Sequence, residues 1–199
     1  KYKQIKKSYN TRKYKNKKFV KRNSNLKSKD MSHKNLFSTE AVSKLKELAE
    51  KARTCMFITN LKKDPPFNSR PMSLQECDED GNLWFISSKE SNKNMEIEVD
   101  NSVQLYFMNN GDYEYLSILG KAFIYDDKST IEEKWSTFAN AWFDGKDDPN
   151  VSVIRVQPTN VYYWDTKVGK FVSMLHFLTA IVTGTKADNT DGVEGKIEI

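Results

Sequence analysis

Hydroxyl and amine side chains gather directly after a short apolar run near the middle of the chain. Residues 83–86 (LWFI) predict a buried strand, and the next seven residues, Ser87 to Lys93, include three serines and two lysines. Lys93 is predicted to open a short helix over residues 93–99, and a helix N-terminus favours a phosphate. Hydroxyls, helix amides and a cation held together can bind an anion. A solvated loop with incidental charges is the alternative.

A second cation is predicted to lie beside this cluster. Residues 70–76 alternate between polar and apolar types, and residues 78–81 (DEDG) supply a turn, so the stretch 70–87 predicts a hairpin. Pairing across that turn brings Met72 opposite roughly Ser87, which places Arg70 near the serines. One arginine, one lysine and several hydroxyls together predict a site for a dianionic phosphate.

Cysteines and histidines do not suggest other chemistry. Cys55 and Cys77 are 22 residues apart and the only histidines are His33 and His176, so no zinc spacing and no disulfide framework is present. Both cysteines are expected to be reduced and at least partly buried, which fits the cytoplasm. His176 lies in an apolar stretch without an acid beside it, which favours a structural role over a catalytic one. No glycine pattern of a Rossmann or P-loop nucleotide site occurs.

The remaining elements predict a mainly β (α+β) fold. Helices are expected over residues 39–53, 130–142 and 171–182, and further strands over residues 55–59, 103–107, 113–125, 151–156 and 161–164. Gly120, inside a strand, indicates a bend or a close backbone approach. Closely spaced strands interrupted by few helices favour an antiparallel barrel.

Charge divides the chain unevenly. Residues 1–30 contain thirteen Lys and Arg and one acid, so with a net charge of +5 overall the rest of the chain carries −7. Residues 1–35 are expected to be a basic, disordered tail, 36–185 the folded domain and 186–199 a C-terminal tail. A nucleic-acid-binding arm is a minor alternative for the basic tail. No apolar run reaches the roughly 18 residues of a membrane span, and the tail has no apolar core of a secretory signal.

Several motifs, in order along about 36–199, resemble the FMN-binding split barrel of the pyridoxamine 5′-phosphate oxidase-like superfamily, and more narrowly its bacterial general stress protein group. They are SRPM (69–72), the turn DEDG, LWFIS (83–87), Ser91-x-Lys93, EYLSILGKA (114–122), WFDGKDDP (142–149), VIRVQP (153–158), YYWD (162–165) and DGVEGK (191–196). The resemblance implies a six-stranded antiparallel split β-barrel with flanking helices. It also implies a homodimer with one FMN in each of two grooves at the subunit interface.

The resemblance also assigns site residues. It gives the FMN phosphate to Arg70, Ser91 and Lys93. The residues that it implies around the isoalloxazine ring are Pro71, Met72, Ile86, Ser87 and Ser88. Tyr115 stands where the oxidases have a glutamine that reaches the flavin from the partner subunit, and Ser117 shares its face. Trp142 would cap the site from the other chain or pack in the core, and Trp164 would lie in the core or at the flavin edge. No catalytic residue and no metal ligand is assigned.

Three functions are compatible with the resemblance. The first is a flavin-dependent oxidoreductase of unknown substrate, and the second is a non-catalytic FMN-binding or flavin-buffering stress protein. Pyridoxamine phosphate oxidation ranks last, because residues 171–178 contain one histidine and no arginine where the oxidases have an arginine- and histidine-bearing segment that binds the substrate's phosphate. Asn92 stands where the oxidases commonly have arginine, so the FMN phosphate site has one cation fewer. Other flavins, F420 or haem are alternative ligands, with His176 a weak haem-ligand candidate. Arg70 and Lys93 favour a compact phosphate.

Overall fold

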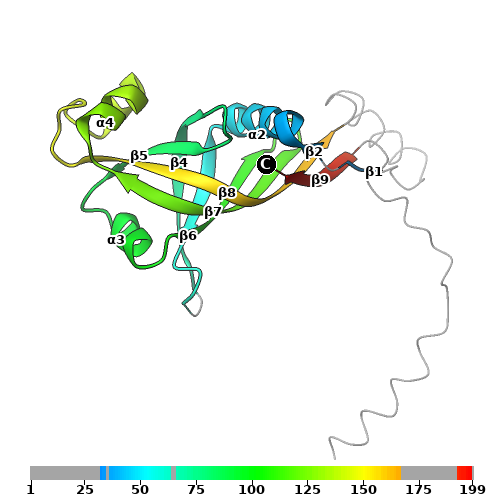
Figure 1. The fold of residues 1–199 in the computed structure, drawn as a ribbon, viewed down its shortest axis with the longest axis horizontal. Helices are drawn as coiled ribbons and strands as arrows, with labels where there is room; N and C mark the ends of the chain where they lie inside the picture. The colour runs from blue at the N-terminus through cyan, green and yellow to red at the C-terminus, as the bar shows by residue number, and fades with distance from the viewer. Residues whose placement is uncertain (1–31, 35, 64–65, 167–191, 199) are drawn as a thin grey trace, which may run out of the picture. The chain divides into compact units, whose positions relative to one another are not determined.

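Six strands form a closed antiparallel barrel in the computed structural model, which describes residues 32–34, 36–63, 66–166 and 192–198 (Figure 1). They are β3 (Thr54–Thr59), β4 (Asn68–Cys77), β5 (Leu83–Ser88), β6 (Ser102–Asn109), β7 (Glu114–Tyr125) and β8 (Val151–Thr166). Their order is β8-β5-β4-β3-β6-β7, and pairing of β7 with β8 closes the ring. The predicted six-stranded split barrel is confirmed.

The barrel interior is filled by alternate side chains of its strands, as expected for strands with one face in the core. Phe57 and Phe85 meet edge to face with ring centroids 5.5 Å apart. Cys55 and Cys77 are free and buried, as predicted. Burial raises the pKa of both thiols, that of Cys77 to about 12, so neither is a reactive thiolate near neutral pH.

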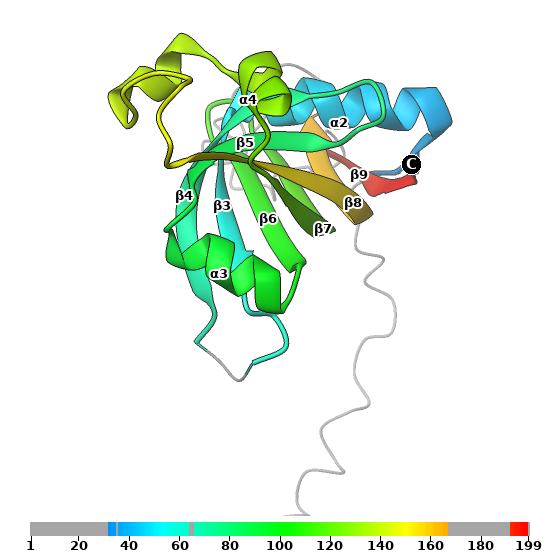
Figure 2. The same cartoon turned by 60° about the vertical axis from the view of Figure 1, so that its left-hand side comes forward.

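Within the described residues, four helical segments flank the strands. They are α2 (Ser38–Ala52), α3 (Asn92–Val99), α4 (Lys128–Lys134) and the 3₁₀ segment η2 (Thr137–Ala141). Helix α2 buries Ala41, Leu45, Leu48 and Ala49 and contacts β4, β6, β7 and β9. Helix α3 lies on the opposite side of the strands from α2 and α4 (Figure 2). In the sequence, α3 connects the end of β5 to the start of β6.

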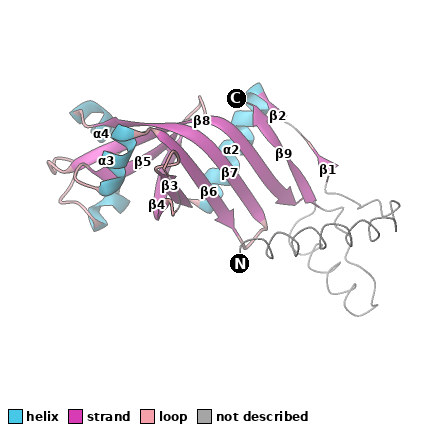
Figure 3. Ribbon diagram, turned by 90° about the horizontal axis from the view of Figure 1, so that it is seen from below, coloured by secondary structure: helices cyan, strands magenta, loops and turns pink. Residues whose placement is uncertain are grey.

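The sheet continues beyond the barrel through the end of the chain. Strand β9 (Gly192–Glu198) pairs antiparallel with β8, and the short strands β1 (Ser32–His33) and β2 (Leu36–Phe37) pair parallel with β9 (Figure 3). The segment 186–199, expected as a tail, thus contributes a strand to the sheet.

The prediction of separate strands over residues 151–156 and 161–164 is wrong, because β8 is one strand that changes partners. Its first part pairs with β5 and its last part with β9, while β7 follows both. A register shift between Leu119 and Gly120 accommodates Pro158 without breaking the strand. A Cβ on Gly120 would lie 2.7 Å from the carbonyl oxygen of Gln157, so the predicted close backbone approach is confirmed.

The prediction of one helix over residues 130–142 is also wrong. Asp127 caps α4 early, its Oδ1 accepting a hydrogen bond of 2.9 Å from the backbone N–H of Thr130. Trp135 then leaves the helix with an extended ψ of 134°, and η2 follows. Ile131 and Trp135 pack against buried residues of the barrel, whereas Phe138 and Trp142 are exposed. The helical spacing of these four side chains therefore does not reflect one shared buried face.

Other predictions fall outside the described residues: those for the basic segment 1–30, for the helix 171–182 and for His176. None of the helices that the structure describes is long and apolar enough to cross a membrane.

Candidate functional site

A cavity of about 570 Å³ opens between the β4–β5 hairpin and the segment 138–150. Its lining residues are Pro71, Met72, Ser73, Gln75, Ile86, Ser87, Ser88, Lys93, Phe138, Ala139, Trp142, Phe143, Asp148 and Asn150. The volume is in the range of roughly 300–1,000 Å³ that small-molecule and cofactor sites have. Seven of the predicted site residues line it: Pro71, Met72, Ile86, Ser87, Ser88, Lys93 and Trp142.

The hairpin register brings the two predicted halves of the site together. Leu74 pairs with Phe85, and the predicted neighbours Met72 and Ser87, two residues beyond that pair on each strand, both line the cavity. A register shift between Leu74 and Glu76 lies farther from the site, near the turn. Beyond Leu74 and Phe85, β4 pairs with β3 and β5 pairs with β8, so these two antiparallel ladders position the cavity residues.

An aromatic wall closes one side of the cavity. Phe138 and Trp142 contact each other with ring centroids 5.2 Å apart, although they are 59% and 64% exposed. Such exposure excludes core packing for Trp142, and its side chain lines a cavity of its own chain. Trp164 lies elsewhere, half-buried on β8 and 4.7 Å from the ring of Tyr162.

Lys93 supplies the positive charge of the cavity wall. The side chain is half-buried, and burial, together with the charge of the nearby Arg70, lowers the pKa of its ammonium group. Among the described residues no carboxylate forms an ion pair with Lys93. Its charge is therefore poorly hydrated and uncompensated, and an anion placed there would relieve both conditions.

Arg70 lies close to Lys93 but does not line the cavity. Its Nη1 donates to Thr59 Oγ1 at 2.7 Å, and its Nη2 forms an ion pair with Glu96 Oε2 at 2.9 Å. Glu96 also accepts hydrogen bonds from Thr59 and Asn68. Burial opposes the charge of Glu96, but the three donors outweigh burial and lower its pKa.

Buried hydrogen bonds fix the start of α3 to the end of β5. Asn94 Oδ1 accepts from Ser87 Oγ at 2.7 Å and from Ser91 Oγ at 3.1 Å, and Asn94 Nδ2 donates to Ser152 Oγ at 2.9 Å. Ser152 in turn donates to the backbone carbonyl of Ser87 at 3.1 Å. Ser91 is the N-cap of α3, and its side chain accepts a hydrogen bond from the backbone N–H of Asn94. At the predicted phosphate site, Ser91 would therefore orient the first amides of the helix.

The sequence interpretation missed Asn94, Ser152 and Glu96. A signal existed for Asn94, because a polar residue three positions after a capping serine is typical of a helix start. Ser152 and Glu96 are linked to the site only by tertiary contacts, 65 and 26 residues away from their partners Ser87 and Arg70.

Tyr115 and Ser117 lie apart from the cavity. Both are on the outer face of β7, which β3 and β6 separate from β4 in the barrel. Ser117 Oγ accepts a hydrogen bond of 3.1 Å from Gln104 on β6. Within one chain these two residues are thus not brought together with the other predicted site residues.

The donor set matches a ligand with an anionic group joined to a flat apolar one. An ammonium without a carboxylate partner among the described residues, the hydroxyl of Ser88 and the first amides of α3 suit a phosphate. Met72, Ile86 and the aromatic wall suit an apolar ring. In the part of the chain that the structure describes, no cluster of His, Cys, Asp or Glu could hold a metal ion. The residues present therefore fit a phosphorylated, ring-bearing cofactor.

Two curated proteins are similar to this chain in sequence. Bacillus subtilis (strain 168) general stress protein 26 is 34% identical over 84 residues, which cover 40% of this chain and 59% of that protein. Neurospora crassa protein bli-3 is 29% identical over 132 residues, covering 60% of this chain and 62% of its own length. The chain thus matches about three-fifths of the length of these curated relatives.

Solved structures share the fold. A structure from Jannaschia sp. CCS1 described as general stress protein 26 superposes with a TM-score of 0.62 at 22% identity, covering 79% of this chain and 99% of that one. The general stress FMN/FAD binding protein from Xanthomonas citri gives a TM-score of 0.55 at 25% identity, covering 64% and 90%. The model of the family described as "Pyridoxamine 5'-phosphate oxidase like" matches residues 40–188. The chain therefore belongs to the pyridoxamine 5′-phosphate oxidase-like family.

Proposed function

We propose that the chain binds FMN in this cavity and acts as an FMN-dependent oxidoreductase. The observation that carries the proposal is Lys93, whose half-buried ammonium lines an otherwise largely apolar cavity without a carboxylate partner among the described residues. Membership of the family and the flavin-binding name of the Xanthomonas citri protein support a flavin as the ligand.

The residues of the chain would bind and orient this cofactor. Lys93 and the amides at the start of α3 would hold the phosphate, with Ser91 fixing those amides by capping the helix. Met72 and Ile86 would contact the ring from the hairpin, and Trp142 would exclude water from the opposite side. FMN supplies the electron-transfer chemistry when it is bound, and the protein supplies its position and electrostatic surroundings.

A homodimer is part of the proposal. The outer faces of β6 and β7 leave Tyr106, Met108 and Leu119 between 40% and 50% exposed, beside Tyr115 and Ser117. An apolar face of this kind on a sheet is typical of a protein interface. A second copy packed there would cover this face and could bring Tyr115 and Ser117 to the flavin of its partner.

A flavin-binding protein without catalysis is the second candidate. Apart from Lys93, the only ionisable residue among the cavity-lining residues is Asp148, and its carboxylate accepts hydrogen bonds from the backbone N–H groups of Asp144 and Asn150. The cavity wall thus offers little for proton transfer, which favours flavin storage or buffering. Pyridoxamine phosphate oxidation remains the least favoured function.

The proposal is tested first by the absorbance spectrum of the purified protein with and without added FMN, followed by mass identification of whatever denaturation releases. Yellow protein that NAD(P)H bleaches supports the oxidoreductase. Yellow protein that neither NAD(P)H nor pyridoxamine phosphate reduces supports the flavin-buffering function, and formation of pyridoxal phosphate would establish the oxidase. Colourless protein that ignores added FMN would overturn flavin binding altogether.

A further inference from the structure

Arg70, the arginine nearest the proposed phosphate site, is paired with the carboxylate of Glu96. Glu96 lies one helical turn after Lys93 on α3, and its Oε2 is 2.9 Å from Nη2 of Arg70. Both side chains are mostly buried, at 24% and 14% exposure, so the pair is shielded from solvent. Three donors hold the Glu96 carboxylate in this position: Arg70, Thr59 and Asn68.

The two terminal nitrogens of Arg70 are therefore both engaged. Nη1 donates to Thr59 and Nη2 to Glu96, so the end-on pair of N–H groups, one of the pairs that arginine can present to a phosphate, is engaged. A phosphate that took this end-on pair of N–H groups would have to break the ion pair with Glu96. Leaving that carboxylate buried without its partner costs free energy.

We propose that Glu96 is a specificity-determining residue that limits the affinity of the cavity for a phosphate group, so that FMN exchanges with solution instead of remaining permanently bound. Arg70, Lys93 and Glu96 together carry a charge of +1, which compensates only half of a dianionic phosphate. The inference rests on the proposed function, because it concerns the same cavity and the same ligand.

The opposite role for Glu96 is physically reasonable. A carboxylate can hold an arginine in the right orientation for a ligand, and the loss of Glu96 would then weaken phosphate binding. The two roles predict opposite signs for the effect of removing the charge at position 96, so one substitution decides between them.

The experiment measures the dissociation constants of FMN and of riboflavin, which lacks the phosphate, for the wild-type protein, Glu96→Gln and Glu98→Gln. Glu98 is an exposed acid on the same helix that does not line the cavity, so it controls for a general change of charge. We expect Glu96→Gln to tighten FMN binding about tenfold or more, because a negative charge near the phosphate is removed and Arg70 is held less strongly by a neutral acceptor. Riboflavin affinity should stay within about twofold, and Glu98→Gln should resemble the wild type.

Glutamine preserves the size of the side chain and one acceptor oxygen, and a thermal unfolding curve shows whether the variant is folded. If the variant does not fold, the wild-type protein still tests the proposal, because its bound FMN should be lost during gel filtration. Retention of FMN by the wild type, or FMN binding by Glu96→Gln that is unchanged or weaker, would overturn the role of Glu96 and leave the proposed function intact. Absence of FMN binding in both the wild type and the variant would instead overturn the proposed function.

Discussion

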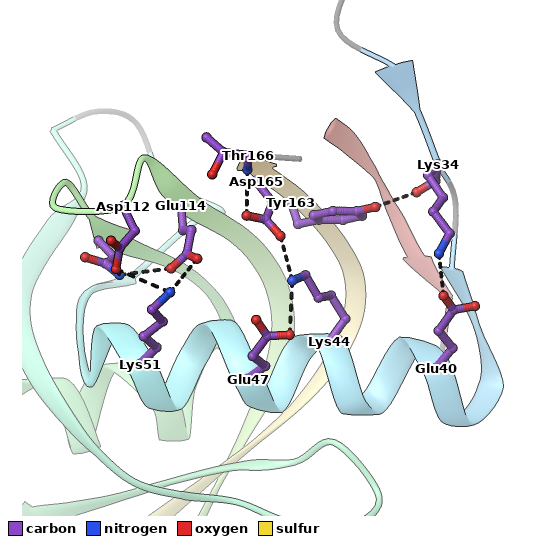
Figure 4. Close-up of polar contacts among 11 residues, drawn as sticks. Lys34, Glu40, Lys44, Glu47, Lys51, Asp112, Glu114, Tyr163, Asp165 and Thr166 are labelled. Carbon is purple, nitrogen blue, oxygen red and sulfur yellow. Dashed lines mark hydrogen bonds and ion pairs between the residues drawn. The ribbon is translucent and has the colours of Figure 1, made fainter. Parts of the chain in front are cut away.

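Lysines have opposite surroundings in two regions of the molecule, on helix α2 and at the start of α3. On α2, Lys44 Nζ lies 2.6 Å from Asp165 and 3.0 Å from Glu47, and Lys51 Nζ lies 2.7 Å from Glu114 (Figure 4). Burial acts to lower the pKa of Lys44, but its hydrogen bonds to Asp165 and Glu47 outweigh burial and raise it. Carboxylates thus accompany the lysines of α2.

Lys93 is the contrasting case. Burial lowers its pKa, Arg70 lowers it further, and within the described ranges no acid pairs with it. Burial opposes the charge in both regions, so the difference lies in whether the fold supplies the counter-ion. The comparison indicates that the lysines of α2 fasten the helix to the strands, whereas Lys93 is arranged to bind an anion that the chain itself does not provide.

The largest expected effect comes from Lys93→Met, which keeps the length of the side chain and removes its charge. We expect FMN affinity to fall about 10- to 100-fold, because a charge-assisted contact with the phosphate is lost. The free energy of unfolding should stay the same or rise, since an uncompensated charge leaves the interior. Flavin fluorescence quenching and urea unfolding measure the two quantities.

Lys44→Met is the matched control for this prediction, because Lys44 is a half-buried lysine that does not line the cavity. Its FMN affinity should equal that of the wild type. Equal loss of FMN affinity in both variants would mean that the effect is one of net charge, and the contrast between the two regions would then have no functional meaning.

The fold was largely accessible from the sequence, because most of its elements rest on local patterns. The alternation of residues 70–76, the DEDG turn and the apolar run 83–86 predict the β4–β5 hairpin that the structure contains. Local patterns failed where one element serves two partners: β8 continues through Pro158 because β5, β7 and β9 pair with it in succession. A sequence window cannot show which strand supplies the next partner.

The candidate site was accessible in part. Lys93 and the hairpin residues follow each other closely along the chain, so register alone places them together. The pairing of Arg70 with Glu96 depends on how α3 packs against β3 and β4, and the sequence suggested a free arginine at that position. Phe138 and Trp142 were assigned to a single helix because their spacing fits one, although the chain leaves α4 at Trp135.

A smaller effect, on stability alone, is expected from Lys44→Met. The substitution leaves the carboxylate of Asp165, 16% exposed, without its main ion-pair partner. We expect the free energy of unfolding to fall by about 1–2 kcal/mol, as for a partly buried pair that loses one member. Lys46→Met is the control, because Lys46 pairs with Glu79, which is 91% exposed, and such surface pairs contribute about 0–1 kcal/mol. Equal losses in the two variants would contradict the structural role given to the α2 pairs.

The smallest expected effect is a difference in how stability depends on pH. The folded-state pKa of Lys93 lies below the unfolded value of 10.5, so between those two pKa values the unfolded chain binds more protons and stability rises with pH. The raised pKa of Lys44 and Lys51 has the opposite sign: their contribution is complete below 10.5 and is lost as the pH rises through the folded-state pKa.

Wild-type protein should therefore gain stability relative to Lys93→Met as the pH rises toward about 10, by less than about 1 kcal/mol because the side chain is only half-buried. Urea unfolding at several alkaline pH values measures this gain. Bound FMN should abolish it, since the phosphate would restore the pKa of the ammonium that it pairs with. A constant difference between the two proteins across the alkaline range would mean that Lys93 is fully hydrated, and the region at the start of α3 would then be no better suited to an anion than the charged surface of α2.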